Sequence, residues 1–197
     1  MRLTVQKLCI VNHVIKKKYY NYCMKAIFFD RDGTLINEPN DDAVSTWEEY
    51  IERPDLSALK QLADRGYLLY IITNQDALAD GRLTEDFYRE TNERLLQTFA
   101  ELEIPIAGIY TCPHTESDGC TCIKPKTGLI DQAIAGRDID LANSFVVGDR
   151  VTDVLLGQAV EAKTIFLQTS RHTLDEGIAS TYVCDTLTQA VEKILAQ

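Results

Sequence analysis

Three cysteines and one histidine lie close together in the segment CPHTESDGCTC, which occupies residues 112–122. Their spacing is C-x-H-x₅-C-x-C, and the four side chains are Cys112, His114, Cys120 and Cys122. Three thiolates and one imidazole are a common tetrahedral ligand set for zinc, and such a closed set leaves no position open for a substrate. We therefore expect a structural zinc ion in this loop, in preference to a chance cluster or a redox disulfide.

Four aspartates could form a second site of a different kind. In DRDGT, Asp30 and Asp32 are two residues apart, so both can point the same way from an extended segment. In GDRVTD, Asp149 and Asp153 add two more carboxylates. Carboxylates a few ångströms apart repel each other unless a cation is present, and Mg²⁺ prefers oxygen ligands. The pattern predicts a magnesium site, whose charge would also keep one aspartate ionised as a nucleophile.

Two further side chains are suited to binding phosphate oxygens. Thr73, in IITNQ, offers a hydroxyl group, and Lys124, in IKPKTG, offers a compact positive charge. Each segment also has an ordinary structural interpretation: a turn for DRDGT, a turn or helix cap for Thr73-Asn74, a solvated surface residue for Lys124, and a helix start capped by Thr152 for GDRVTD. The functional interpretation gains support from the joint placement of these segments at the ends of successive predicted strands.

The elements that would position these residues alternate between strands and helices. Apolar runs predict strands over 25–30, 67–72, 107–111, 144–148 and 164–167, with a weaker strand near Val183. Helical periodicity predicts helices over 53–67, 84–102, 128–136, 152–162 and 187–196. This alternation is typical of a parallel sheet covered on both faces. We predict an α/β fold, a three-layer α/β/α Rossmann-like parallel sheet with no large cap domain and a zinc-binding loop.

The polar segments follow successive predicted strands. DRDGT comes at the end of the first strand, Thr73-Asn74 after the second, the Cys/His segment after the third and GDRVTD after the fourth. Ligands of such sheets bind beyond the carboxyl ends of the strands. The order along the chain therefore predicts a single site at one edge of the sheet.

The overall composition narrows the classes of function. The 197 residues carry a formal net charge of -10, which argues against a nucleic-acid-binding protein, because such proteins present a basic face. No apolar run approaches the roughly 18 residues that a membrane-spanning helix needs. The cysteines outside the cluster are scattered and no secretory signal is evident, so we expect reduced thiols and a cytoplasmic protein.

The first 23 residues differ from the rest of the chain. They are basic and show no pattern bounded by turns, whereas Met24 opens the segment MKAIFFDRDGTL. We predict a non-essential extension over residues 1–23 and one catalytic domain over residues 24–197. The alternative is that the extension forms a basic arm that binds a partner.

Four segments, taken in order, resemble a known family. FFDRDGTL, IITNQ, IKPKTG and VVGDRVTD are similar to the four signature segments of the haloacid dehalogenase-like phosphatases, and they cover residues 24 to about 170. The resemblance implies that Asp30 is the nucleophile that becomes an aspartyl-phosphate and that Asp32 is the general acid and base. It also implies that Thr73 and Lys124 hold the transferring phosphoryl group.

The same resemblance implies the ligands of the magnesium ion. Asp149 would bind Mg²⁺ together with Asp30 and the backbone carbonyl of Asp32, and Asp153 would support this site. The expected protein is a Mg²⁺-dependent phosphomonoester hydrolase with a structural Zn²⁺. We expect it to be a monomer that acts on a small phosphorylated metabolite.

The zinc loop, without a large cap domain, resembles two branches of the family. These are the histidinol-phosphate phosphatases and the D-glycero-D-manno-heptose 1,7-bisphosphate phosphatases, and we expect one of these two substrates, with Asn74 and Ile123 at the substrate. Both branches usually carry an arginine immediately before the motif lysine, where it helps to bind substrate. This chain has Ile123 at that position, which leaves the exact substrate open.

Three other interpretations remain. One is a phosphatase of another small phosphorylated metabolite. A second is a receiver-type signalling domain, which also uses Asp, Thr, Lys and Mg²⁺, but whose phospho-accepting aspartate comes later in the chain than its acidic pair. The third is a catalytically inactive interaction module, against which the presence of every expected catalytic residue argues.

Overall fold

A computed structural model describes residues 23–39, 43–169 and 171–197. Its centre is a six-stranded sheet with the order β3-β2-β1-β4-β5-β6, in which every neighbouring pair is parallel. The strands are β1 (Ala26–Phe29), β2 (Leu68–Asn74), β3 (Ile106–Cys112), β4 (Phe145–Gly148), β5 (Lys163–Leu167) and β6 (Tyr182–Cys184). The predicted parallel α/β sheet is confirmed.

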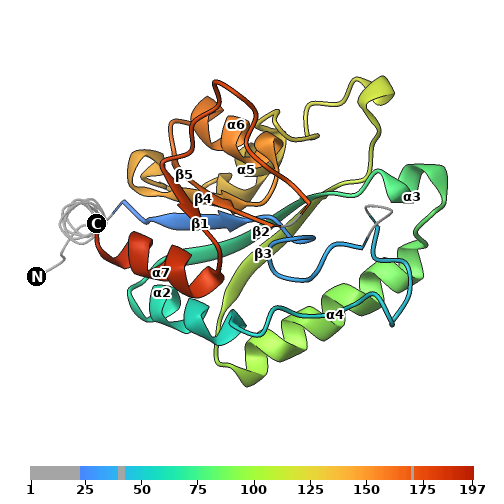
Figure 1. The fold of residues 1–197 in the computed structure, drawn as a ribbon, viewed down its shortest axis with the longest axis horizontal. Coiled ribbons are helices and arrows are strands. Elements are labelled where there is room, and N and C mark those ends of the chain that lie inside the picture. Colours follow the sequence, from blue (N-terminus) through green and yellow to red (C-terminus); the bar gives the residue numbers. More distant parts are fainter. Residues whose placement is uncertain (1–22, 40–42, 170) are drawn as a thin grey trace, which may run out of the picture.

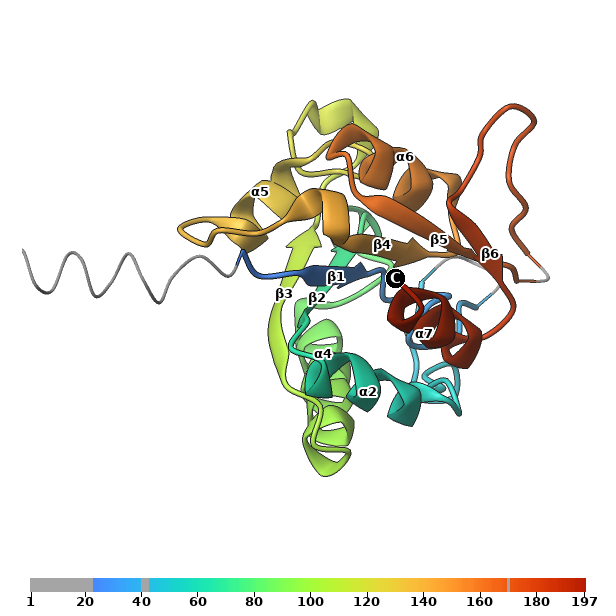
Figure 2. The same ribbon diagram turned by 90° about the vertical axis from the view of Figure 1, so that its left-hand side faces the viewer.

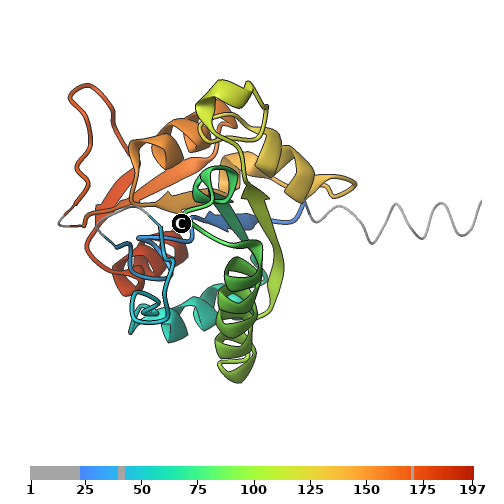
Figure 3. The same ribbon diagram turned by 90° about the vertical axis from the view of Figure 1, so that its right-hand side faces the viewer.

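Helices cover both faces of this sheet. The α-helices are α2 (Lys60–Asp64), α3 (Ala77–Asp80), α4 (Glu85–Glu101), α5 (Gly128–Ile134), α6 (Val151–Ala159) and α7 (Leu187–Leu195). Short 3₁₀ segments are η1 (Leu56–Leu59), η2 (Glu116–Asp118) and η3 (Leu141–Asn143). Figures 1 and 2 show α5 and α6 on one face of the sheet and α2, α4 and α7 on the other. Seen from the opposite side in Figure 3, η2 lies on the same face as α5 and α6.

The alternation of side chains along β1 explains the three layers. Ile27 and Phe29 point to the core that is shared with α2, α4 and α7, whereas Ala26 and Phe28 point to the core that is shared with α5 and α6. All four are essentially inaccessible to solvent. A central strand that is apolar on both faces is stable only when both faces are covered.

The order of the strands reverses beside β1. The chain runs from β1 outward through β2 to β3, and then returns to form β4 on the other side of β1. The register continues past the strand, because the amide of Asp30 donates to the carbonyl of Val147 at 2.8 Å. The crevice between the ends of β1 and β4 is the usual ligand site of such sheets. Asp30 and Asp149 follow these two strands.

The predicted helix over 53–67 differs from the one observed. Residues before Leu56 are not helical, Leu56–Leu59 is a 3₁₀ segment, and only Lys60–Asp64 is α-helical. Pro54 disfavours helical geometry at Arg53, and Gly66, with φ of +82°, ends the helix. The amide of Arg53 instead donates to the carbonyl of Leu35 at 3.0 Å.

The predicted domain start at Met24 falls at the edge of the described structure. Residues 1–22 of the predicted extension lie outside the described residues. Met24 itself joins the fold, because its amide donates to the carbonyl of Asp138 at 3.0 Å and its carbonyl accepts from Asp140 at 2.8 Å. Among the described residues, no helix has both the length and the apolar character needed to cross a membrane.

Candidate active site

A buried lysine connects two of the predicted carboxylates. The ammonium group of Lys124 donates to Asp30 Oδ1 at 2.5 Å, to Asp153 Oδ1 at 2.7 Å and to the carbonyl of Ile72 at 3.1 Å. All three charged side chains are less than a tenth exposed. Burial alone would lower the pKa of Lys124, but the charges of Asp153 and Asp30 outweigh it and raise the pKa. The lysine is therefore held in its charged form beside Asp30.

Asp149 has the environment of a metal ligand. It is fully buried, and neither of its carboxylate oxygens has a hydrogen-bond partner. Burial, followed by the charges of Asp30 and Asp153, raises the pKa of Asp149 to about 8. One oxygen from each of these three aspartates lies within 4.8 Å of the others. Because unpaired buried carboxylates are costly, this set fits a divalent cation with oxygen ligands.

A glycine leaves the space that Asp149 occupies. Gly33 has φ of +83°, and a Cβ atom built at this position would lie 2.2 Å from Asp149 Oδ2. Any side chain here would both strain the backbone and displace the carboxylate. The glycine of DRDGT thus lets the loop after β1 approach the end of β4.

Both oxygens of Asp32 accept hydrogen bonds. Arg31 Nη1 donates to Oδ1 at 2.9 Å, and Gln75 Nε2 donates to Oδ2. The same Gln75 nitrogen donates to Thr73 Oγ1 at 2.9 Å, so the two predicted catalytic side chains share one partner. Burial raises the pKa of Asp32, and the charge of Arg31 partly opposes this.

Asn74 ties the lysine segment to the end of β2. Its Oδ1 accepts from the amide of Lys124 at 2.9 Å, and its Nδ2 donates to the carbonyl of Lys124 at 3.3 Å. This pair of bonds joins residues that are 50 positions apart. Sequence analysis placed Asn74 at the substrate, and it does border the cleft, but its side chain also positions Lys124.

A cleft of about 320 Å³ opens above these residues. Its lining comprises Asp30, Asp32, Glu38, Thr73, Asn74, Asp76, Arg82, Glu116, Ile123, Lys124, Arg150 and Thr152. Six of the residues predicted from sequence are among them, and Asp149 and Asp153 lie close to Asp30 behind this surface. The fold therefore does bring together the segments that sequence analysis assigned to one site.

The four predicted zinc ligands also converge. Cys122 Sγ lies 3.1 Å from Cys112 Sγ and 3.3 Å from His114 Nδ1, and Cys120 Sγ lies 3.7 Å from Cys112 Sγ. All three cysteines are free thiols. Four soft and borderline donors, grouped within 4.8 Å, are the donor set that zinc prefers. The residues present therefore fit a zinc ion with no position left for substrate.

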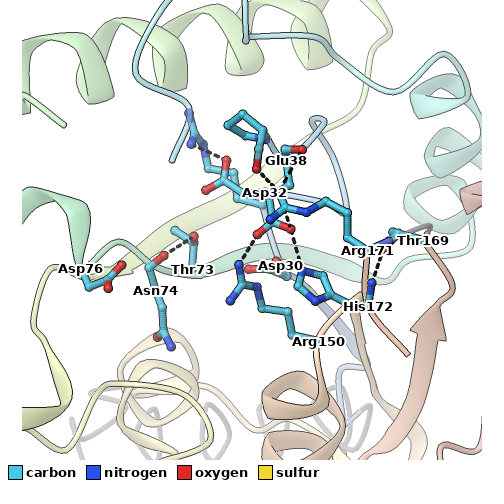
Figure 4. A network of polar contacts seen from close by, with 12 residues as sticks. Asp30, Asp32, Glu38, Thr73, Asn74, Asp76, Arg150, Thr169, Arg171 and His172 are labelled. Carbon is cyan, nitrogen blue, oxygen red and sulfur yellow. Dashed lines mark hydrogen bonds and ion pairs between the residues drawn. The ribbon is translucent and has the colours of Figure 1, made fainter. Parts of the chain in front are cut away.

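One group at the site was missed by sequence analysis. Figure 4 shows Glu38 facing Arg150, Arg171 and His172. Its nearly inaccessible carboxylate pairs with Arg150 Nη2, with His172 Nε2 at 2.7 Å and with Arg171 Nη1 at 3.7 Å. These contacts join the loop after β1 to the loops after β4 and β5. Arg150 stands within GDRVTD, but no spacing in the sequence pointed to Glu38.

The fold and this site define a hydrolase of the haloacid dehalogenase-like class. A family model described as HAD-hydrolase-like matches residues 121–190, which include Lys124, Asp149 and Asp153. The D-glycero-beta-D-manno-heptose-1,7-bisphosphate 7-phosphatase of Pasteurella multocida is 38% identical over 160 residues, which are 78% of this chain and 86% of that protein. The histidine biosynthesis bifunctional protein HisB of Campylobacter jejuni is 34% identical over 134 residues, which are 67% of this chain and 38% of that protein.

A solved structure shows the same relationship. The D,D-heptose 1,7-bisphosphate phosphatase of B. bronchiseptica, complexed with magnesium and phosphate, superposes with a TM-score of 0.77 at 28% identity. The match covers 88% of this chain and 99% of that one. The chain therefore belongs to the haloacid dehalogenase-like phosphatases, in the branch that contains the heptose-bisphosphate phosphatases.

Proposed function

We propose that this phosphatase is Mg²⁺-dependent and hydrolyses D-glycero-D-manno-heptose 1,7-bisphosphate through an aspartyl-phosphate on Asp30. The observation that carries the chemistry is the buried set in which Lys124 contacts Asp30 and Asp153 while Asp149 keeps two unpaired oxygens. Asp149, Asp30 and the backbone carbonyl of Asp32 would hold Mg²⁺, with Asp153 in support. When bound, this ion neutralises charge on the phosphoryl group.

The side chains then divide the reaction into two steps. In the first, an Asp30 oxygen attacks phosphorus, the bond from phosphorus to the ester oxygen breaks, and Asp32 gives its proton to the leaving oxygen. In the second, water attacks phosphorus, Asp32 takes the proton, and the bond from phosphorus to Asp30 breaks. Thr73 and Lys124 hold the phosphoryl oxygens throughout. Free phosphate leaves, and both aspartates return to their starting states.

The relatives support the heptose substrate. The match to the Pasteurella multocida phosphatase spans 86% of that protein, and the solved structure with magnesium and phosphate also belongs to a heptose bisphosphate phosphatase. The second candidate is histidinol phosphate. It is favoured by the 34% identity to the histidine biosynthesis protein and by Ile123, which cannot donate hydrogen bonds to a second phosphate.

A panel of phosphate esters tests this proposal. Phosphate release should be measured from heptose 1,7-bisphosphate, histidinol phosphate and p-nitrophenyl phosphate, first after treatment with EDTA and then with added MgCl₂. We expect activity only with MgCl₂ and the highest kcat/KM for the heptose bisphosphate. Equal activity with and without the metal would contradict the proposed chemistry, and a higher kcat/KM for histidinol phosphate would transfer the assignment to the second candidate.

We also infer that the Cys/His loop holds a structural zinc ion. Lys124 follows the last thiol ligand by two residues, so a metal that orders the loop would also order the lysine. Mass-spectrometric metal analysis of the purified protein should find about one zinc per chain.

We propose further that catalysis requires only residues 24–197. Met24 joins the fold through two backbone bonds, to Asp138 and Asp140. Before it, Cys23 makes one exposed contact, from its thiol to Asp138 Oδ1 at 3.4 Å. A protein that starts at Met24 should keep the kcat and KM of the full chain. Loss of folding or activity on this truncation would show that the preceding segment is structural. We also predict that the protein is a monomer and that it is located in the cytoplasm. Light scattering tests the first prediction and cell fractionation the second.

A further inference from the structure

The two sides of the Asp32 carboxylate are held by separate parts of the fold. Arg31 donates to Oδ1 and Gln75 donates to Oδ2. Both donors are buried, with 1% of Arg31 and 4% of Gln75 exposed. Because each oxygen has its own donor, the carboxylate cannot rotate without breaking a buried hydrogen bond.

Each donor is in turn fixed by a second partner. Arg31 Nη2 donates to Thr91 Oγ1 at 2.6 Å, and its guanidinium lies 5.1 Å from the centre of the Tyr88 ring. Thr91 is fully buried on α4, so this helix sets the position of the arginine. A buried guanidinium costs free energy unless it is paired, which suggests a role beyond packing.

Gln75 is anchored on the opposite side of Asp32. Its backbone amide donates to the carbonyl of Cys112 at 2.7 Å, and its side chain also donates to Thr73 Oγ1. The glutamine thus extends from the ends of β2 and β3 to the carboxylate. Neither TNQ nor DRDGT alone reveals this arrangement, since it depends on the packing of α4 and the register of β2 with β3.

We propose that Gln75, and Arg31 together with Thr91, are positioning residues that aim Asp32 at the leaving oxygen. This inference rests on the proposed role of Asp32 as general acid. A correctly placed acid matters most when the leaving group is a poor one. An alkoxide needs a proton as it leaves, whereas p-nitrophenolate is stable without one. Misplacing Asp32 should therefore slow the first step for alkyl phosphates and spare it for the aryl phosphate. The second step, in which Asp32 takes a proton from water, is the same for both, so the two esters are compared by kcat/KM.

The test compares two esters in Thr91→Val and Gln75→Met. Thr91→Val keeps the shape of the side chain but removes the acceptor of Arg31. The Thr91 hydroxyl bonds to Arg31 and to the carbonyl of Tyr88, and Thr91 does not line the cleft. For Thr91→Val we expect kcat/KM on glycerol phosphate or the heptose bisphosphate to fall about 10-fold, while kcat/KM on p-nitrophenyl phosphate changes less than about 2-fold, because kcat/KM reports the first step alone. Gln75→Met should lower both rates, because Thr73 loses a donor, and should still lower the alkyl rate more.

A matched control separates positioning from general loss of packing. Thr164→Val removes another buried threonine hydroxyl, which bonds to Ser180 and the backbone of Thr181 far along the chain from Asp32. It should lower the melting temperature and leave the ratio of the two rates unchanged. Circular dichroism confirms that each variant is folded before its kinetics are compared.

The outcomes are distinct. Equal losses on both esters in Thr91→Val, or no loss on either, would overturn the positioning role. Asp32→Asn provides the benchmark and should show the same preference for the aryl ester on a larger scale. If Asp32→Asn shows no such preference, or if the wild type has no esterase activity, the proposed function fails, and that result is separate from a failure of Thr91→Val alone.

Discussion

The carboxylate site and the Cys/His loop are both suited to metals, but the protein builds them differently. Asp30 and Asp149 stand at the ends of two adjacent core strands, and their surroundings are buried. The Cys/His loop starts at the end of β3 but continues through exposed residues 116–119, with only the short turn η2 between its first and last ligands. The sheet therefore positions the aspartates, whereas the loop depends on its own ligands.

Lys124 belongs to both regions. Its ammonium group lies in the carboxylate site, but its backbone follows the last cysteine of the loop by two residues. Asn74 is the side chain that joins the two regions, through its bonds to the Lys124 backbone. We therefore predict that substitutions of the aspartates abolish catalysis while the fold stays intact. Substitutions in the Cys/His loop should weaken catalysis, because Lys124 is then less firmly held.

The largest effect is expected for Asp30→Asn. The amide is a very poor nucleophile, so kcat should fall by more than about 10³-fold. The fold should persist, because Lys124 keeps Asp153 as a partner. Rapid-quench measurement of phosphoryl transfer in a single turnover, together with thermal melting, checks both points. Near-normal turnover by this variant would disprove the nucleophile assignment.

Loss of a zinc ligand should have a smaller effect that spares the sheet. In Cys120→Ser we expect the zinc content to fall and kcat/KM to drop by about 10–100-fold, because the segment from 112 to 124 loosens around Lys124. The core should still melt cooperatively, and excess Mg²⁺ should not restore activity, since it prefers oxygen ligands.

Cys184→Ser is the matched control for the zinc experiment. Cys184 is a buried free thiol on β6, at the far edge of the sheet from β3. Its substitution should leave the zinc content at about one per chain. A wild-type protein that is fully active without zinc would contradict the role of the loop, and an unchanged zinc content in Cys120→Ser would contradict the ligand assignment.

The two regions also show what sequence can and cannot predict. Apolar strands followed by polar residues predicted the shared edge, because strand ends in a parallel sheet must meet there. The Cys/His ligands were predictable because they are close in sequence. The contacts of Glu38 were not, since Arg150 and His172 are 112 and 134 residues away and no periodicity encodes such pairs. The burial of Arg31 was missed for the same reason, since its partner Thr91 lies 60 residues on.

Ile123 lies where the two regions meet, and Ile123→Arg tests what this position contributes to specificity. A guanidinium can donate two hydrogen bonds to a second phosphate, which isoleucine cannot. We expect the ratio of kcat/KM for heptose bisphosphate over histidinol phosphate to rise by about 10-fold, which corresponds to about 1.4 kcal/mol. Ile123→Leu serves as the uncharged control and should leave the ratio unchanged. An unchanged ratio in Ile123→Arg would show that position 123 does not contact the substrate.

The smallest effect concerns how pH alters the stability that Mg²⁺ adds. In the metal-free protein the pKa of Asp149 is raised to about 8 by burial and by Asp30 and Asp153, whereas an exposed aspartate has a pKa of about 3.9. The folded state then binds more protons than the unfolded state between these values, so the metal-free protein loses stability as pH rises through this range. Mg²⁺ binds the ionised carboxylate, so its stabilising effect should grow over the same range.

At pH 8 the increase in melting temperature on adding MgCl₂ should exceed that at pH 5.5 by about 2–4 °C, the change expected for roughly 1 kcal/mol in a chain of this size. Asp149→Asn should lower this increase and reduce its dependence on pH, and the remaining dependence comes from Asp153, whose pKa is raised by burial to about 6. The Cys/His loop should keep its zinc at every Mg²⁺ concentration. Equal increases in melting temperature at both pH values would show that Asp149 is already ionised without Mg²⁺. The sheet would then hold the charged carboxylates together without help from the metal, in contrast to the Cys/His loop.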